Sequence, residues 1–247
     1  MRLQALVICF ISFSATSSFA MQFDFKSAGA GTYFRGEYGL AQKGGASFEQ
    51  SSGTGVSFDQ SRTTNAAIEF GLLFRAGKSI LRVSAVGLIP KSLSGVVGSV
   101  GGTSKYTLDS KVFAVIPQAT LDLLVKQWAE SRFMISLGGG LAIVTTTNTY
   151  TMTGGYAGVS DHTESGKGQG LSLHAGVAYE FVFADHATLV ADLGYRYCRV
   201  ASLTAKDAVT TFSGTYAEGA TLKNMDGSDR SLDLGGVFGG LGFRFYF

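Results

Sequence analysis

The segment Leu241-Gly242-Phe243-Arg244-Phe245-Tyr246-Phe247 decides the fold, because bulky apolar side chains occupy every second position in it. Residues two apart in a β-strand project from the same face. One face of this segment is therefore wholly apolar, while the other face carries Gly242, Arg244 and Tyr246. Such an alternation predicts a strand with an apolar medium on one side and a polar environment on the other.

The same alternation recurs in seven further windows along the chain. With the last strand they are Gly31–Ala41, Ala66–Arg75, Ile80–Ile89, Val112–Val125, Arg132–Val144, Gly170–Phe183, Ala187–Cys198 and Leu234–Phe247. No position on the apolar face of any window is charged. The opposite face carries Arg35, Glu37, Glu69, Arg75, Arg82, Asp122, Arg132, Glu180, Asp192, Arg196 and Arg244.

These windows have about the length that a tilted strand needs to cross a bilayer. An eight-stranded barrel has an interior just wide enough for side chains, so the bulky aromatic face must point outward. A charge on that face would cost roughly 2–4 kcal/mol at the bilayer midplane, which explains why it carries none. The main rival is a soluble lipocalin-like carrier, which would need the opposite orientation.

The spacers between the windows alternate in length. Three are short: Ala76–Ser79, Lys126–Ser131 and Ala184–His186. Four are long and rich in Gly, Ser, Thr and Asn: Gln42–Asn65, Pro90–Lys111, Thr145–Gln169 and Arg199–Asp233. The pattern predicts an all-β fold, an eight-stranded antiparallel up-and-down transmembrane β-barrel with short periplasmic turns and four long extracellular loops. Pro117 cannot donate to a ladder, so a β-bulge is expected there.

The N-terminus reads as an export signal. Arg2 precedes the apolar run Leu3–Phe13, and small residues lead to Ala20, so residues 1–20 are expected to be a signal peptide and 21–247 the barrel domain. We therefore expect localisation in the outer membrane of a Gram-negative bacterium. The formal net charge is only +2, which argues against a nucleic-acid partner.

The sequence resembles the small eight-stranded outer-membrane barrels, namely the OmpA-type membrane domain and the opacity-like surface antigens. The features that carry the resemblance are the final aromatic residue, the first-strand segment Tyr33–Gly39 and the segment Gly138–Ala142. In such families the last strand is recognised by the barrel-assembly machinery. The resemblance implies that role for Phe243, Phe245 and Phe247, with outer-membrane lipid and lipopolysaccharide as surroundings.

The charged side chains of the inward face should pair, because an unpaired charge inside so narrow a barrel would be very costly. We predict an interior charge network that fills the barrel. Its members are Arg35, Glu37, Glu69, Arg82, Asp122, Glu180, Asp192, Arg196 and Arg244.

No enzymatic motif is compelling, and we expect no catalytic activity, cofactor or metal. Ser172 and His174, with Glu180, form the best triad-like set, but their phase points into the barrel rather than toward lipid. Asn224, Asp226 and Asp229 form a weaker metal candidate than the turn that Asp226-Gly227 indicates. Cys198 is expected to be a small inward-facing filler.

The long loops carry the remaining functional signal. Ser47–Ser51 and Ser57–Ser61 form a near repeat that can pair as a hairpin, and Val209–Phe212 with Thr215-Tyr216 can do the same. Loops of this length are usually functional or disordered. We therefore expect a surface structural or adhesion-type protein that contacts a host or envelope ligand through its loops. A lipid-modifying enzyme (a deacylase or acyltransferase) and a narrow porin are the alternatives.

Overall fold

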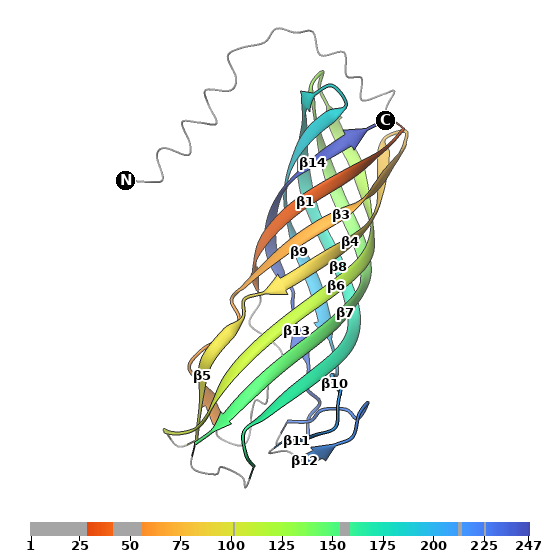
Figure 1. The fold of residues 1–247 in the computed structure, drawn as a ribbon. Coiled ribbons are helices and arrows are strands. Elements are labelled where there is room, and N and C mark those ends of the chain that lie inside the picture. The colour runs from red at the N-terminus through yellow and green to blue at the C-terminus, as the bar shows by residue number, and fades with distance from the viewer. Residues whose placement is uncertain (1–28, 42–55, 101, 154–158, 212–213, 225) are drawn as a thin grey trace, which may run out of the picture.

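The computed structural model describes residues 29–41, 56–100, 102–153, 159–211, 214–224 and 226–247. Within these residues eight long strands form a closed ring of antiparallel pairs, in the order β8-β7-β6-β4-β3-β1-β14-β9, with β9 pairing again with β8 (Figure 1). The strands are β1 (Ala30–Ala41), β3 (Thr64–Ala76), β4 (Ser79–Pro90), β6 (Thr103–Gln127), β7 (Ser131–Met152), β8 (His162–Ala184), β9 (Ala187–Val200) and β14 (Gly236–Tyr246). The eight predicted strands are therefore confirmed, and the predicted signal peptide lies outside the described residues.

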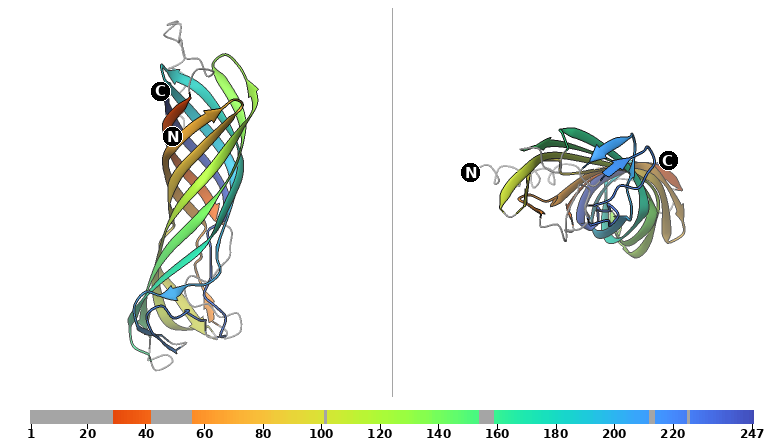
Figure 2. Two further views of the ribbon diagram at one scale, coloured as in Figure 1. Left: turned by 90° about the vertical axis from the view of Figure 1, so that its right-hand side faces the viewer. Right: turned by 90° about the horizontal axis from the view of Figure 1, so that it is seen from below.

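The strands are strongly tilted, and the view along the barrel shows them surrounding a narrow interior (Figure 2). Side chains alternate between that interior and the outer surface, as in β4, where every second residue is buried. The three predicted short turns join β3 to β4, β6 to β7 and β8 to β9 at the end that holds the C-terminus. No helix among the described residues is long and apolar enough to cross a bilayer.

Two of the predicted long loops consist largely of strand. β6, β7 and β8 continue well beyond the predicted windows, and their pairing runs to Tyr106↔Met152 and Tyr150↔His162. β5 (Leu93–Val100) adds to the edge of this extension by pairing with β6, and β2 (Val56–Phe58) pairs with β5. We call this extension of β6–β8, with β5 and β2, the blade. The predicted boundaries were wrong here because they followed the apolar face, which ends before the strands do.

The predicted pairing within the first loop stays a prediction, because its first arm, Ser47–Ser51, lies outside the described residues. Its second arm contributes β2, which pairs with β5. In the fourth loop, β11 (Val209–Thr211) and β12 (Gly214–Tyr216) form the expected hairpin, with Val209 opposite Tyr216.

Pro117 causes no bulge, contrary to expectation. Val115 pairs with Ile143 and Gln118 with Gly140, so the register of β6 on β7 is the same on both sides of the proline. The lost N–H is accommodated by two missing pairs in this ladder, without an inserted residue. The register shift between β6 and β7 falls instead between Leu124 and Lys126, near the turn.

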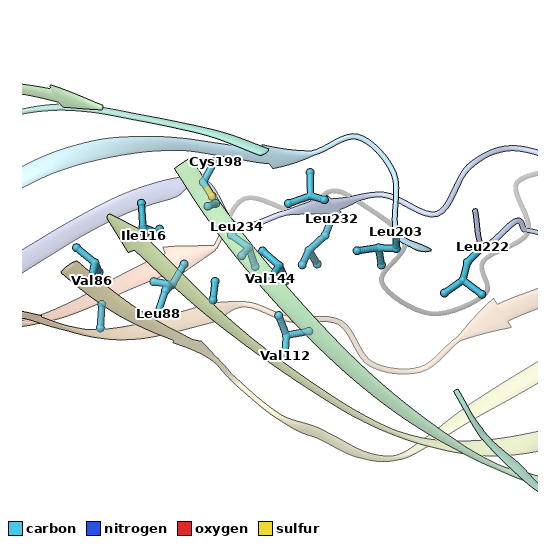
Figure 3. Packing of buried hydrophobic residues seen from close by; sticks show 14 of the residues in the cluster. Val86, Leu88, Val112, Ile116, Val144, Cys198, Leu203, Leu222, Leu232 and Leu234 are labelled. Carbon is cyan, nitrogen blue, oxygen red and sulfur yellow. The ribbon is translucent and has the colours of Figure 1, made fainter. Parts of the chain in front are cut away.

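The fourth loop folds back into the mouth of the barrel. Short strands β10 (Thr204–Ala205) and β13 (Leu232–Asp233) anchor it to β8 and β9. Leu203, Leu222, Leu232 and Leu234 of this loop are at most 2% exposed. They pack on inward-facing apolar side chains at the end of the barrel opposite the short turns, which we call the upper end although Figure 1 draws it at the bottom. These side chains are Val86, Leu88, Val112, Ile116, Val144 and Cys198 (Figure 3). We call this loop segment, residues 201–235, the plug loop.

Candidate functional site

The charged side chains of the barrel interior form one continuous chain of ion pairs. Among the described residues it contains five arginines and five carboxylates, so the interior is neutral overall. Followed away from the turn end, the linked residues are Arg132, Glu180, Arg244, Asp122, Arg82, Glu69, Arg35, Glu37 and Arg196, with Asp192 as a branch on Arg35. All nine sequence-predicted network residues lie inside the barrel.

Arg82 and Arg244 connect the lower half of the chain. Arg82 is 3.0 Å from Asp122 and 3.4 Å from Glu69, while Arg244 is 2.6 Å from Asp122 and 2.9 Å from Glu180. Each arginine thereby bridges two carboxylates from different strands. Ordered charges of this kind fix how the strands align, because a slip of one residue would turn them outward.

The upper half of the chain ends on Arg196. Its guanidinium binds both oxygens of Glu37, at 2.6 and 2.8 Å, in the bidentate geometry that arginine and carboxylate favour. Arg35 links Glu37 to Glu69 and lies 3.3 Å from Asp192. Both arginines also lie within cation–π range of Phe238, whose ring centroid is 5.3 Å from Cζ of Arg35 and 5.2 Å from Cζ of Arg196.

Several partners of this network were missed at the sequence level. Arg132 was placed on the inward face but not in the network, yet it is 2.7 Å from Glu180. Tyr246 and Thr188 also donate to Glu180, at 2.6 and 2.5 Å, and Tyr33 donates to Glu69. Tyr33 and Tyr246 lie two residues from Arg35 and Arg244 on the same face of their strands, and this shared phase is the signal that would have found them.

The triad-like set does not assemble. Ser172 and His174 are buried inside the barrel, and the His174 ring contacts Thr120 at 3.2 Å. Glu180 is instead held by the arginines and hydroxyls of the lower network. Gly138 supplies the room for His174, because a Cβ there would lie 2.3 Å from the ring. The weak metal candidate forms a turn, in which Asp226 accepts from the Ser228 backbone and hydroxyl.

A small cavity shows how closely the interior is filled. The cavity lined by Tyr33, Arg35, Arg82 and Asp192 measures about 10 Å³, which leaves room for about one water molecule. Above the charges, the leucines of the plug loop occupy the mouth of the barrel. The charged side chains and the plug-loop leucines thus fill successive levels of the barrel interior.

A buried ion pair outside the barrel proper holds the plug loop to the blade. Arg230 of the loop is 2.6 Å from Glu164 on β8, and both side chains are fully buried. Asn148 donates to the same carboxylate at 3.2 Å, and Tyr150 lies 3.3 Å from the Arg230 guanidinium. We call the Arg230–Glu164 pair the latch.

Other polar contacts tie the remaining parts of the blade together. Arg62 donates to Ser110 at 2.6 Å, and burial lowers the pKa of Arg62 to about 10. Asp109 accepts from the Gly95 backbone and the Ser94 hydroxyl, both at 2.8 Å, and these bonds hold its pKa below the usual range. This carboxylate therefore joins β5 to β6.

The outer surface of the ring shows where the barrel resides. Its outward side chains are large and apolar, with Phe70 62% exposed and Leu137 49% exposed, while the charged side chains are sealed inside. Exposed apolar surface on that scale is stable only in contact with hydrocarbon, and a closed sheet leaves no unpaired backbone in the lipid. The chain is an outer-membrane β-barrel with its short turns in the periplasm and its long loops outside.

The last strand carries the predicted assembly signal on the lipid-facing side. Phe243, Phe245 and Phe247 are 40%, 50% and 75% exposed, and β14 closes the ring by pairing with β1. Recognition of these residues by the assembly machinery stays a prediction.

No family model matches the chain, and no curated protein is significantly similar to it. Among solved structures it is similar to Ail, the attachment invasion locus protein of Yersinia pestis, with 15% identity, a TM-score of 0.42 and coverage of 88% of this chain and 99% of that one. It is similar to the outer-membrane protein OprG from Pseudomonas aeruginosa, with 13% identity, a TM-score of 0.46 and coverage of 89% and 96%. It is also similar to Neisserial surface protein A, NspA, with 13% identity, a TM-score of 0.37 and coverage of 89% of this chain and 99% of that one. The likeness is one of overall fold.

Proposed function

We propose that the protein is a sealed surface-display barrel, which anchors the blade and the plug loop outside the cell so that they contact a host or envelope ligand. The observation that carries this proposal is the length of β6, β7 and β8. They run for 25, 22 and 23 residues, whereas about 9–11 residues suffice to cross a bilayer. Beyond the last outward apolar residues, Phe113, Ile143 and Leu171, roughly two fifths of each strand is therefore available to build a structure in the extracellular space.

The blade has the internal support expected of a presented surface. Ordering a residue costs about 1–2 kcal/mol of backbone entropy, so an extracellular sheet needs compensating contacts. Tyr106 and Tyr150 supply an aromatic core with ring centroids 5.7 Å apart, and the latch adds a buried ion pair. A rigid surface loses less entropy on binding than a mobile loop does.

The proposal includes a barrel that neither conducts ions nor performs catalysis. The absence of conduction is supported by two fillings that lie one after the other along the barrel axis, the chain of ion pairs and the leucines of the plug loop. The inward, buried positions of Ser172 and His174 support the absence of catalysis, because a lipid substrate would lie on the other side of the wall.

Attachment of displaying cells tests the presented surface. Cells that display the protein should bind host-cell or matrix-coated surfaces more strongly than cells with an empty vector. Thr103→Arg, Ser104→Arg and Thr215→Arg together should abolish the gain, because these exposed positions lie at the extracellular tips. Lys78→Arg in a periplasmic turn is the matched control. Equal attachment by displaying and empty-vector cells would refute the display role.

Two further measurements test the sealed barrel. In planar bilayers the purified protein should give no steady current, and a stable ohmic conductance would favour the narrow porin instead. Incubation with phospholipid and lipopolysaccharide should release no acyl chain, and any turnover lost in Ser172→Ala would favour the enzyme.

A further inference from the structure

The outward face of β6–β8 continues from the lipid-facing surface into the extracellular space without a break. The last apolar side chains on this face are Phe113 on β6, Ile143 on β7 and Leu171 on β8, all exposed. The next outward positions above Phe113 and Ile143 are Lys111 and Thr145. Because a strand rises about 3.3 Å per residue, Lys111 lies about 7 Å along β6 from Phe113. This level is that of the lipid headgroups.

Lysine and threonine side chains are grouped at this level. Lys111 on β6 is the register partner of Thr147 on β7, and Thr145 on β7 is the partner of Lys167 on β8. The two lysines thus flank β7, with two threonines between them. Strands lie about 4.8 Å apart, so the lysine Cα atoms are about 12 Å apart, a span that two long flexible side chains can close around one small anion.

The face above these residues is polar and regular. Thr149 and Thr151 continue the outward side of β7, with Thr107 and Thr163 as their neighbours on β6 and β8. The hydroxyls of Thr149 and Thr163 are 3.3 Å apart. The opposite face of the same strands is covered, since Tyr106, Leu108 and Tyr150 are buried there. The threonine side is therefore the open face of the blade.

The signs of the charges differ between the two edges of the apolar belt. At the extracellular edge Lys91 joins Lys111 and Lys167 as an exposed outward cation. At the periplasmic edge exposed lysines alternate with acids, as in Lys126 and Glu130. Asp109, the outward neighbour of Lys111 on the blade, is an anion whose carboxylate is turned toward β5, where it accepts from Gly95 and Ser94. A cationic edge with adjoining hydroxyls is complementary to phosphate groups on a saccharide headgroup.

We propose that Lys111 and Lys167, with Thr145 and Thr147 between them, bind a phosphate group of the outer-leaflet glycolipid, lipopolysaccharide, and that the threonine face above them lies against its sugars. The inference rests on the outer-membrane location. It concerns the lipid that surrounds the barrel at the membrane edge and not the ligand proposed for the extracellular tips. The occupant is a lipid because the site directly continues the surface that already contacts acyl chains.

Binding of purified lipopolysaccharide to the full chain in detergent micelles tests this site. We expect one or a few lipids per protein by native mass spectrometry. Lys111→Glu with Lys167→Glu should weaken the affinity at least tenfold, and the difference should shrink at high salt. Lys206→Glu, an exposed lysine in the plug loop, is a control for the altered charge of the protein.

The same lipid after chemical removal of its phosphates separates a phosphate site from apolar adhesion. We expect the wild type to bind it as weakly as the double variant binds the intact lipid. Equal affinity for both lipids, or an equal loss in Lys206→Glu, would overturn the proposal. Tighter binding of a soluble sulfated polysaccharide than of the lipid would also overturn it, by assigning the face to another ligand. A failed attachment experiment would leave these outcomes unaffected.

Discussion

Removing the positive charge of the latch should release the plug loop while the barrel stays intact. Arg230→Met keeps most of the side-chain volume but leaves the Glu164 carboxylate fully buried, where it still accepts a hydrogen bond from the Asn148 amide. Loss of one member of a buried ion pair typically costs about 3–5 kcal/mol, because the other charge remains desolvated. At 1.4 kcal/mol per tenfold, the open form of the loop should gain roughly two to three and a half orders of magnitude in population.

Hydrogen exchange measures this opening at the loop amides. The bond from Leu222 to Leu203 and that from Arg230 to Leu222 lie within the docked loop, so their exchange should accelerate by about that factor in Arg230→Met. Amides of the membrane-spanning strands should be unaffected, because the charge chain below does not include the latch. Addition of trypsin should cut the plug loop of the variant before any other segment.

Two further variants make the argument refutable. Lys223→Met breaks an ion pair with Asp229 in the same loop, but these side chains are 43% and 44% exposed, so at most about 1 kcal/mol should be lost. Arg230→Met with Glu164→Gln removes both buried charges and should recover most of the lost protection. If Arg230→Met and Lys223→Met accelerated exchange equally, the latch would not be what holds the loop.

Three other substitutions test the barrel and the blade. Phe70→Arg places a charge on the lipid-facing surface and should lower the unfolding free energy by about 2–4 kcal/mol, as read from urea denaturation in lipid vesicles. Gly138→Ala should slow barrel formation, read as the gel shift between unboiled and boiled protein. His174→Ala in the same chain should restore part of the rate, because the ring is the nearest obstacle and the Thr120 hydroxyl, 2.7 Å from the added Cβ, is the other. Because the folded-state pKa of Asp109 is lowered, its tether to Gly95 should be intact above about pH 4 and weaken as the pH falls below it. Exchange of the Gly95 amide, corrected for its intrinsic pH dependence, should show that loss in the wild type and not in Asp109→Ala.

The membrane-spanning part of the fold followed from the sequence, because lipid imposes a simple rule on it. Every outward side chain between the two headgroup layers must be apolar, so alternation in hydrophobicity coincides with alternation in direction. The blade escaped detection for the same reason. On β7 the outward side chains change from apolar residues to Thr145, Thr147, Thr149 and Thr151, so the alternation in hydrophobicity stops there. The strand itself continues, because β-branched threonine also favours the strand conformation.

Nine of the ten charged members of the network were predicted, whereas their pairing was not. Inward phase and the cost of burial require that arginines and carboxylates neutralise one another. Which residues meet depends on the tilt of the strands, since Arg244 reaches Asp122 from 122 positions away and Arg196 reaches Glu37 from 159. Alternation along one strand contains no information about that stagger. Arg132 entered the network for the same reason, because the neighbour that it meets is determined by the closed ring.

The plug loop meets a need that the sequence implies only indirectly, namely an apolar occupant for the apolar lining at the upper end of the barrel. In the upper barrel the inward positions of β4, β6 and β7 change from charged to apolar, as Val86, Val112 and Val144 show. An apolar lining open to water would be unfavourable, so such a lining requires an apolar occupant. The leucines of the fourth loop meet that need, although only Leu232 and Leu234 have a strand spacing, and Leu203 and Leu222 lie far from them in the sequence. The lower filling therefore fixes strand register through directional ion pairs, and the upper filling attaches a loop through non-directional contacts. For this reason we expect changes in the plug loop to alter what the cell surface presents while the membrane-spanning ring remains folded.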